Sequence, residues 1–274
     1  MFLKILQTPE GLKVEAPDCF NLEYTLACGQ AFRWKKTGDN RFRGIAFGRV
    51  LGIEQKGGEL LLDNTDREDF EKYWREYFDL DRDYASICKS FSADKSLKTA
   101  VEEYYGIRIL RQEPWETLCS FIISQNNNIP RIEGIILRLC ESLGEPLGDG
   151  NFAFPTPEAI LDGGFEGLVS ARAGFRTKYI LNAAQKISSG EVVLENLSNL
   201  PLEDARAELM KIKGVGPKVA ECVLLYGLGR LDAFPVDVWV KRVMSEMYPE
   251  GLPPCTKGFE GVAQQYLFHW RRHQ

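Results

Sequence analysis

A lysine and an aspartate lie nineteen residues apart in a part of the sequence whose turns could bring them together. Lys218 follows a glycine-rich turn, and Asp237 follows a proline and a valine. A lysine amine is a nucleophile when neutral, and partial desolvation together with a helix N-terminus disfavours its protonated form. A carboxylate beside it would stabilise positive charge that develops on a substrate. The pair therefore indicates nucleophilic attack on a carbon that becomes cationic.

The turn before the lysine is typical of a phosphate-binding hairpin. Helical patterns flank it in LEDARAELMKI (202–212) and PKVAECVLLYGL (217–228). Gly214 and Gly216 allow the backbone to approach a phosphate closely, and Pro217 suits a first helical turn because it has no N–H to lose. Free amides and the positive end of the second helix dipole would then face an anion. These features predict a helix-hairpin-helix that binds a DNA backbone.

Each of these features also has an ordinary structural explanation. Many hairpins of this composition only bind DNA, with a basic residue on phosphate. An aspartate at the start of a helix is a common N-cap, so Asp237 alone would carry little weight. A lysine and an aspartate that face each other across a hairpin are more specific for catalysis than either residue alone.

The composition is that of a globular protein. Of 274 residues, 44% are apolar and 27% charged, which is enough for one large domain or two modest ones. The seven cysteines include no CxxC pair, and their odd number without a secretion signal fits reduced thiols. No apolar run reaches about 18 residues, and the N-terminus becomes polar too early for a signal peptide. We therefore expect a cytoplasmic protein with no metal, no cofactor and no membrane partner.

Charge is distributed unevenly along the chain. The formal net charge is −5, but residues 205–245 hold seven basic against four acidic residues, whereas residues 54–83 hold five against eleven. Distant acidic charge is screened beyond about 10 Å at 0.1 M salt, so a basic surface near the hairpin could still bind phosphates. A solvated helix face explains the local charge equally well.

The sequence pattern changes near residue 90. Before it, aromatic or β-branched runs separated by turn signals predict antiparallel strands, in YTLACGQAFRWKK (24–36), RFRGIAFGRVLGIEQ (41–55) and GGELLLDNT (57–65). After it, long helical patterns dominate. We expect an α+β protein with an N-terminal antiparallel β-sheet domain at residues 1–92 and a larger all-helical domain at residues 93–274.

The lysine and aspartate pair resembles that of the helix-hairpin-helix-GPD superfamily of DNA glycosylases. A lysine in the hairpin separates its strand-cleaving members from those that use aspartate and water alone. Endonuclease III relatives carry four clustered cysteines after this region for an iron–sulfur cluster, but only Cys255 follows here. Motifs over nearly the whole chain resemble the 8-oxoguanine DNA glycosylases, in the same order: ACGQAFRW (27–34), CSFIISQNNNIPRI (119–132), AGFRTKYI (173–180), GVGPKVAEC (214–222) with PVDVW (235–239), and GVAQQYLF (261–268).

The resemblance implies a bifunctional DNA glycosylase/AP lyase that flips 8-oxoguanine out of duplex DNA and excises it through a lysine Schiff base and β-elimination. Lys218 would be the nucleophile, and Asp237 would stabilise the sugar cation. The carbonyl of Gly29 would accept the N7–H of the oxidised base, although a simple turn glycine is the ordinary explanation. The other residues expected around the base are Cys222, Tyr226, Pro235, Gln264 and Phe268, with the glutamine on the Watson–Crick edge and the phenylalanine on the flat face. Core packing is the alternative for these residues.

The resemblance also implies a set of DNA contacts. Asn126 would fill the gap left by the extruded nucleotide, and Phe175 would be a wedge beside it, where animal members have tyrosine. Arg131 and Arg176 would read the orphaned cytosine, although arginines on a solvated helix are the alternative. The backbone contacts would come from Gly214, Gly216, Val219 and Trp239, the last in place of a histidine of the family.

The implied partner is duplex DNA that contains 8-oxoguanine, preferably opposite cytosine, bound by a monomer associated with a prokaryotic nucleoid. Two other functions fit parts of the sequence. A non-enzymatic helix-hairpin-helix module would bind DNA but would need neither a base pocket nor a paired aspartate. An alkylbase glycosylase of the same fold would keep the aspartate, lack the lysine and bind cationic bases in an aromatic pocket.

Overall fold

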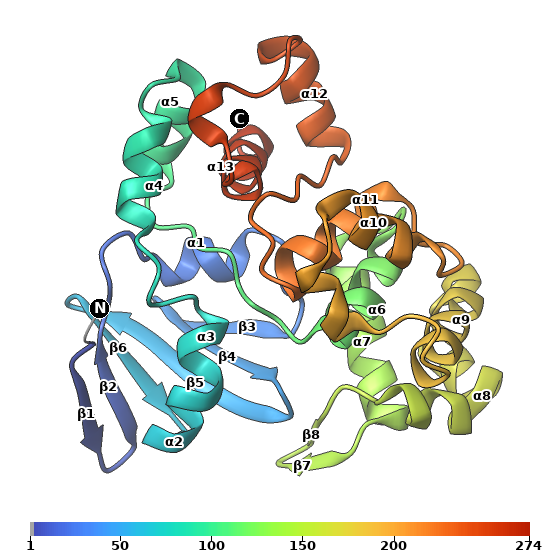
Figure 1. Ribbon diagram of the computed structural model, residues 1–274. Coiled ribbons are helices and arrows are strands. Elements are labelled where there is room, and N and C mark those ends of the chain that lie inside the picture. Colours follow the sequence, from blue (N-terminus) through green and yellow to red (C-terminus); the bar gives the residue numbers. More distant parts are fainter. Residues whose placement is uncertain (1–2) are drawn as a thin grey trace.

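Six antiparallel strands form a sheet in the computed structural model, which describes residues 3–274 (Figure 1). The strands pair in the order β1-β2-β6-β5-β4-β3. Their bounds are β1 (Ile5–Thr8), β2 (Gly11–Glu15), β3 (Trp34–Gly38), β4 (Arg41–Ala46), β5 (Arg49–Lys56) and β6 (Glu59–Asp63). The predicted antiparallel sheet is confirmed, and residues 41–55 and 57–65 contribute β4, β5 and β6 as expected.

Buried and exposed side chains alternate along the strands, so that one face of the sheet is buried. In β4, Phe42 is buried, whereas Arg41 and Arg43 on either side of it are exposed. Gly44, the next residue on the buried side, makes room for an aromatic ring. A Cβ at this position would lie 2.3 Å from the ring of Trp34 on β3, so no other residue fits without movement of the indole.

Aromatic side chains of one continuous helical segment cover the buried face. The segment consists of α2 (Arg67–Asp69), the π-helical turn η1 (Phe70–Trp74) and α3 (Arg75–Tyr77). The Trp74 ring meets the Trp34 ring edge-on at 6.4 Å between centroids, and Trp34 Nε1 donates to the Tyr77 hydroxyl at 2.6 Å. Such pairs add a preferred geometry to the burial of large apolar surfaces. Aromatic rings thus hold the helical segment on the sheet.

The expectation of a strand throughout residues 24–36 is wrong. The first part of that stretch belongs to helix α1 (Leu22–Ala27), and β3 begins only at Trp34. Asn21 caps α1 by accepting a hydrogen bond from the backbone N–H three residues later, at 2.9 Å. The buried residues of α1 are Leu22, Thr25 and Leu26, at helical spacing. Gly29 therefore lies between a helix and a strand, not between two strands.

Helices form most of the remaining chain. Their bounds are α4 (Tyr84–Phe91), α5 (Lys95–Glu103), α6 (Pro114–Ser124), α7 (Ile129–Leu143), α8 (Pro157–Ser170), α9 (Thr177–Ser188), α10 (Leu202–Met210), α11 (Pro217–Cys222), α12 (Val238–Met247) and α13 (Glu260–Arg272). Shorter elements are η2 (Gly174–Arg176), η3 (Leu194–Asn199), η4 (Val223–Gly227), η5 (Pro254–Thr256) and a hairpin of β7 (Pro146–Gly148) and β8 (Asn151–Phe152). The α+β class, with a sheet followed by a helical domain, is confirmed, but the sequence patterns did not predict β1, β2, α2 to α5, α8 or the β7–β8 hairpin. Within residues 3–274, no helix is both long and apolar enough to cross a membrane.

Two apolar cores meet where the sheet joins the helices. Leu110 belongs to the core under the sheet, whereas Cys28 belongs to the core of the helices. The buried side chain of Gln30 connects the two: its amide donates to the backbone carbonyl of Arg108 at 2.7 Å and accepts from the backbone N–H of Leu110 at 2.9 Å. The N-terminal part of the chain contributes to both cores, and the boundary between residues 92 and 93 stays a prediction.

The C-terminal helix α13 returns to the N-terminal part of the chain. Figure 1 shows it in red, beside α12 and close to α5. Gln265 of α13 donates from Nε2 to the backbone carbonyl of Cys28 at 3.0 Å. The hydroxyl of Tyr226, from η4, donates to Oε1 of Gln265 at 2.5 Å. One helix thus joins the loop after α1 to the helix that follows the hairpin.

Candidate active site

The predicted hairpin connects α10 to α11, and α11 continues directly into η4. Gly214 has a left-handed φ of +87°, and a Cβ there would lie 2.4 Å from the ring of Tyr179. Glycine is therefore required both for the backbone conformation and for the close approach of the ring. Gly216 is the N-cap of α11, and nothing lies within 4 Å of the place where its Cβ would be. The turn presents backbone, not side chains, to the space in front of it.

Three backbone N–H groups at the start of α11 have no partner in the described part of the chain. They belong to Gly216, Lys218 and Val219, because the first helical hydrogen bond runs from Ala220 N to Gly216 O at 3.0 Å. Free amides at a helix N-terminus attract an anion, and the helix dipole adds to this attraction. Val219 itself is buried, so its side chain packs in the core. The arrangement suits a phosphate group.

Lys218 is half-buried in the first turn of α11, and its amine has no counter-ion within 4.0 Å among residues 3–274. Nζ lies 4.9 Å from the centroid of the Phe121 ring on α6. It also interacts with the thiol of Cys222, one helical turn further along. Burial raises the pKa of this thiol to about 11, although Lys218 acts in the opposite direction, so the thiol is protonated at neutral pH. The neighbours of the amine are therefore a ring and a neutral thiol.

Asp237 is the N-cap of α12, in agreement with its ordinary structural explanation. Its Oδ1 accepts a hydrogen bond from the backbone N–H of Val240 at 2.8 Å. Its Oδ2 has no hydrogen-bond partner within residues 3–274. Lys218 lowers the pKa of the Cys222 thiol and Asp237 raises it, so both charges act on the same side chain. One carboxylate oxygen thus caps a helix, and the other is available to a ligand.

A buried glutamate links the segment of Asp237 to the helix of Lys218. Glu221 of α11 is 5% exposed, and its Oε2 accepts from the backbone N–H of Phe234 at 2.6 Å. Its Oε1 pairs with Arg206 of α10. One feature of the sequence could have indicated this role, since an acidic residue inside an apolar helical run needs buried partners. Glu221 is therefore a positioning residue for the candidate pair.

A stack of side chains extends from Lys218 towards α13. The rings of Phe121 and Tyr226 are stacked, with centroids 5.3 Å apart and an interplanar angle of 16°. The Tyr226 hydroxyl bonds Gln265 and lies 3.4 Å from Oε1 of Gln264. Gln264 is 4% exposed, yet its Nε2 has no partner among the described residues. A largely buried amide normally uses its donors, so this one is available to a ligand.

Gly29 faces Phe268 of α13 across a narrow gap. It has a left-handed φ of +83°, and a Cβ there would lie 3.8 Å from the Phe268 ring and 3.7 Å from Ile129. The carbonyls on either side of Gly29 accept hydrogen bonds from glutamine side chains, at 3.0 and 2.7 Å. The Gly29 carbonyl itself accepts none from residues 3–274. A free acceptor thus lies at the edge of a half-buried aromatic ring.

The three asparagines between α6 and α7 have different tasks. Asn127 donates to the backbone carbonyl of Ile123 at 3.1 Å. Asn128 caps α7 by accepting from the backbone N–H of Arg131 at 3.0 Å. Asn126 is exposed, adopts a left-handed φ of +50°, and its side chain has no partner in the described chain. Only Asn126 has a free side chain, and its role in DNA remains a prediction.

Arg176 lies beneath this loop and is 1% exposed, so the alternative of a solvated arginine is wrong for it. Its guanidinium donates to the backbone carbonyls of Gln125 and Asn126 at 3.1 and 3.2 Å. Burial and, to a smaller extent, the positive charge of Arg131 lower the pKa of Arg176. Arg131 is exposed. Arg131 therefore has donors free for a base, whereas Arg176 holds the loop in place.

Exposed apolar side chains surround the candidate site. Phe175 is 50% exposed, and the Arg176 guanidinium lies 4.4 Å from its ring centroid. The exposed apolar residues around Asp237 are Val236, Val238 and Trp239. Pro235, two residues before Asp237, is buried. Neighbouring exposed apolar side chains of this kind mark interaction surfaces. The Phe175 ring lies 6.0 Å from that of Tyr179, which packs against Gly214 of the hairpin.

Two family models match consecutive parts of the chain. The model described as 8-oxoguanine DNA glycosylase, N-terminal domain, matches residues 12–118, and the model of the HhH-GPD superfamily base excision DNA repair protein matches residues 119–251. The N-glycosylase/DNA lyase of Saccharomyces cerevisiae is 34% identical over 261 residues, which cover 83% of this chain and 68% of that protein. The chain belongs to the 8-oxoguanine DNA glycosylase family.

Solved structures and a plant relative agree with this assignment. A structure of MBOgg1 in complex with a low-affinity DNA ligand has a TM-score of 0.94 and 42% identity, and it covers 100% of this chain and 99% of that one. The 8-oxoguanine glycosylase/lyase of Clostridium acetobutylicum, in complex with double-stranded DNA containing cytosine opposite 8-oxoguanine, has a TM-score of 0.92, 37% identity and 98% coverage of each chain. N-glycosylase/DNA lyase OGG1 of Arabidopsis thaliana is 33% identical, and the match covers 81% of this chain but only 64% of that protein. As a member of this family, the protein is a DNA glycosylase/lyase.

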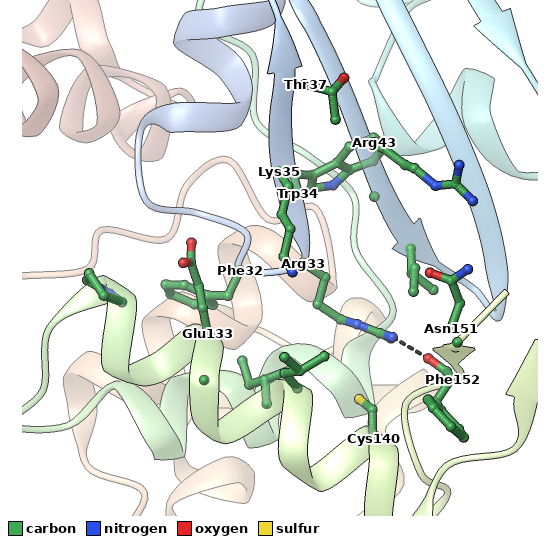
Figure 2. A pocket seen from close by; sticks show the side chains of 17 residues that line it. Phe32, Arg33, Trp34, Lys35, Thr37, Arg43, Glu133, Cys140, Asn151 and Phe152 are labelled. Atoms are coloured by element: carbon green, nitrogen blue, oxygen red, sulfur yellow. Dashed lines mark hydrogen bonds between the residues drawn. The ribbon is translucent and has the colours of Figure 1, made fainter.

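A cavity of about 420 Å³ lies elsewhere in this glycosylase, between the sheet and α7 (Figure 2). Its walls come from β3, β4, α7 and the β7–β8 hairpin, and none of the predicted site residues lines it. Arg33 donates to the backbone carbonyl of Phe152 and pairs with Glu116 at 3.3 Å. Because Arg33 already has partners and no predicted site residue lines the walls, we interpret this space as a gap between packed domains and not as the base pocket.

Proposed function

We propose that the protein excises 8-oxoguanine from duplex DNA with Lys218 as the nucleophile. The neutral amine attacks C1′ of the damaged nucleotide, the bond from C1′ to the base breaks, and the base leaves. Asp237 stabilises the positive charge that develops on the sugar. The amine and C1′ then form a Schiff base, from which β-elimination breaks the strand on the 3′ side of the site.

The contact between the helix of Lys218 and the segment of Asp237, in which Glu221 accepts a hydrogen bond from the backbone N–H of Phe234, carries this proposal. The amine has no counter-ion in the described chain that would have to be displaced before it reacts. The carboxylate has one oxygen that its helix cap does not use. The free amides of the same turn can hold a neighbouring phosphate, which would place C1′ of the nucleotide near both groups. A hairpin that only binds DNA would need neither the free oxygen nor the half-buried amine.

We infer that the base is recognised between Gly29 and α13. The N7–H of 8-oxoguanine would donate to the free Gly29 carbonyl, whereas guanine has an acceptor at N7 and would leave that carbonyl unpaired. The Phe268 ring would cover the flat face of the base, and the Gln264 amide would bond its Watson–Crick edge. The opposite wall would be made by Cys222, Tyr226 and Pro235. The nucleotide must leave the base stack to reach this pocket, and Asn126 would occupy the gap.

Gly29→Ala is expected to slow 8-oxoguanine excision roughly ten- to a hundredfold, because the methyl group would lie between Phe268 and Ile129 where the base must enter. Single-turnover excision rates measure this, with duplex binding as a parallel readout that should change little. Gly48→Ala is a matched control, because Gly48 also has a left-handed φ, of +67°, with no neighbour within 4 Å. Equal losses in both variants would attribute the effect to backbone strain and remove Gly29 from the pocket.

Excision is expected to be roughly ten- to a hundredfold faster opposite cytosine than opposite adenine. Cytosine offers O2 and N3 as acceptors for the exposed donors of Arg131, whereas adenine is larger and presents an N6 donor. Arg131→Ala should therefore remove most of the difference in single-turnover rates. Arg138→Ala, on the same helix and bonded to the backbone carbonyl of Ala171 at 3.1 Å, should preserve it. Equal rates opposite both bases in the unmodified enzyme would exclude orphan reading by Arg131.

Substrate range tests the proposed function as a whole. Duplexes that contain 8-oxoguanine, 7-methylguanine or only normal bases would be compared under single-turnover conditions. We expect base release and strand cleavage at 8-oxoguanine and neither at the other bases. Preferred release of the cationic methylated base would support an alkylbase glycosylase, and binding without any release would contradict the proposed chemistry.

A further inference from the structure

Two buried thiols are in contact outside the candidate active site. Cys19, in the loop between β2 and α1, and Cys88, on α4, have their Sγ atoms 3.4 Å apart, and the residues are only 3% and 4% exposed. The Tyr266 hydroxyl of α13 lies 3.3 Å from the sulfur of Cys88 and 3.8 Å from that of Cys19. A disulfide needs about 2.05 Å between the sulfurs, so the two atoms would have to approach by only roughly 1.3 Å.

A buried cation favours the loss of a proton from Cys19. Arg108 is fully buried, and its side-chain hydrogen bonds within residues 3–274 all go to backbone carbonyls, including that of Cys19 at 3.0 Å. A negative charge on the neighbouring sulfur would balance this cation better than neutral carbonyls do. The hydrogen bond from Cys88, followed by that from Tyr266 and the charge of Arg108, lowers the pKa of Cys19 to about 7, although burial opposes the shift. Cys19 is thus the more nucleophilic thiol of the pair.

An open cavity extends to Cys88, one member of this pair. A cavity of about 410 Å³ between α4 and α5 is lined by Cys88 and by Tyr105, with the cationic side chains of Lys89 and Lys98 nearby. Tyr105 is 45% exposed and, to a small extent, lowers the pKa of the Cys19 thiol. The wall of the cavity thus includes Cys88, whose sulfur is in contact with that of Cys19.

We propose that Cys19 and Cys88 form an oxidisable pair that reacts with a hydroperoxide to give a disulfide. The Cys19 thiolate attacks one peroxide oxygen: an S–O bond forms, the O–O bond breaks, and the other oxygen takes a proton and leaves as water or an alcohol. The Cys88 sulfur then attacks the sulfenic sulfur, the S–S bond forms, and the hydroxyl takes the Cys88 proton and leaves as water. The two thiols lose two electrons together, and the peroxide gains them.

No other two thiols in residues 3–274 lie in contact. Cys28 donates to the backbone carbonyl of Thr25 at 3.2 Å, and burial raises its pKa to about 12. Burial also raises the pKa of Cys140 to about 12. Such buried, protonated thiols react slowly with peroxides. The reaction should therefore be selective for Cys19 and Cys88.

Peptide mapping of the full-length chain tests this directly. The reduced protein would be treated with one equivalent of hydrogen peroxide, unfolded in an alkylating reagent and digested. We expect two of the seven cysteines to escape alkylation, a loss of two hydrogens from the intact mass, and one crosslinked peptide pair that joins Cys19 to Cys88. Full alkylation of these two residues, or a crosslink between other cysteines, would overturn the proposal.

Three serine variants test which thiols take part in the reaction. Cys19→Ser should slow peroxide-dependent thiol loss by roughly tenfold or more, and neither Cys19→Ser nor Cys88→Ser should yield the crosslink. Cys255→Ser removes a half-exposed thiol whose backbone carbonyl accepts from Ser90 at 3.2 Å, and it should leave the crosslink unchanged. Thiol loss at the wild-type rate in Cys19→Ser would also overturn the proposal. The peptide map of the unmodified protein tests the pairing even if a variant does not fold.

Discussion

Lys218→Gln is expected to abolish base excision and strand cleavage while DNA binding stays largely intact. Glutamine keeps a polar side chain of similar reach, but its amide is not a nucleophile, so the rate should fall by several orders of magnitude. The free backbone amides of Gly216 and Val219 do not depend on this side chain, and phosphate binding should therefore persist. Single-turnover excision and a binding titration on one 8-oxoguanine duplex measure the two effects separately.

Lys213→Gln is the matched control for this variant. Lys213 is an exposed lysine of the same turn, and its backbone N–H donates to Oδ1 of Asn182 at 2.7 Å, a contact that the substitution keeps. Its loss should weaken binding at low salt and leave the excision rate at saturating protein unchanged. The assignment of the nucleophile fails if Lys218→Gln still excises at the wild-type rate, or if Lys213→Gln is the variant that loses excision.

Asp237→Asn is expected to slow excision by roughly two to three orders of magnitude, the usual effect of removing one electrostatic stabiliser of a transition state. Asparagine is also a good N-cap, and its oxygen can still accept the hydrogen bond of Val240, so the helix should remain intact. The substitution therefore removes the charge and keeps the cap. Single-turnover rates with a thermal melt of the same sample distinguish the two roles.

Asp83→Asn provides the comparison for Asp237→Asn. Asp83 caps α4 in the same way, by accepting from the backbone N–H of Ser86 at 3.0 Å, but it is not a candidate site residue. Excision by Asp83→Asn should equal that of the wild type. A folded Asp237→Asn protein that excises normally would show that its carboxylate is a cap alone.

The hairpin could be predicted from the sequence because its constraints are local. Gly214 is required by a positive φ and by the nearby ring of Tyr179, Gly216 begins a helix, and Pro217 has no N–H to leave unpaired. These requirements act on adjacent residues, so they leave a recognisable pattern. The same is true of β4 to β6, where alternating side chains and tight turns specify the strands.

Helix α1 could not be predicted in this way because tertiary contacts decide its structure. Its six residues include one aromatic and one β-branched side chain, which suit a strand, beside leucine, glutamate and alanine, which suit a helix. Its start is held by distant backbone: Asn21 N donates to the carbonyl of Gly106 at 2.8 Å, and the Thr25 hydroxyl bonds the same carbonyl at 3.2 Å. A six-residue helix has little stability of its own without such contacts.

The residues that support the candidate site could not be predicted from the sequence either, because their partners are distant in the chain. Arg176 uses its guanidinium on backbone carbonyls about fifty residues earlier in the chain, and Glu221 bonds a backbone amide thirteen residues later. Gln265, next to the predicted Gln264, makes the strong contacts with Tyr226 and with the loop before Gly29. Residue types and spacing indicated the chemistry, but only the fold shows which polar groups hold the site together.

Borohydride trapping on a duplex with 8-oxoguanine opposite cytosine tests the central claim most directly. Borohydride reduces a Schiff base between the protein and C1′ to a stable amine, and digestion of the adduct then identifies the residue that carries the sugar. We predict a covalent adduct in the wild type that maps to Lys218 and is absent from Lys218→Gln. Base release without any trapped adduct, or an adduct on another residue, would contradict the proposed mechanism.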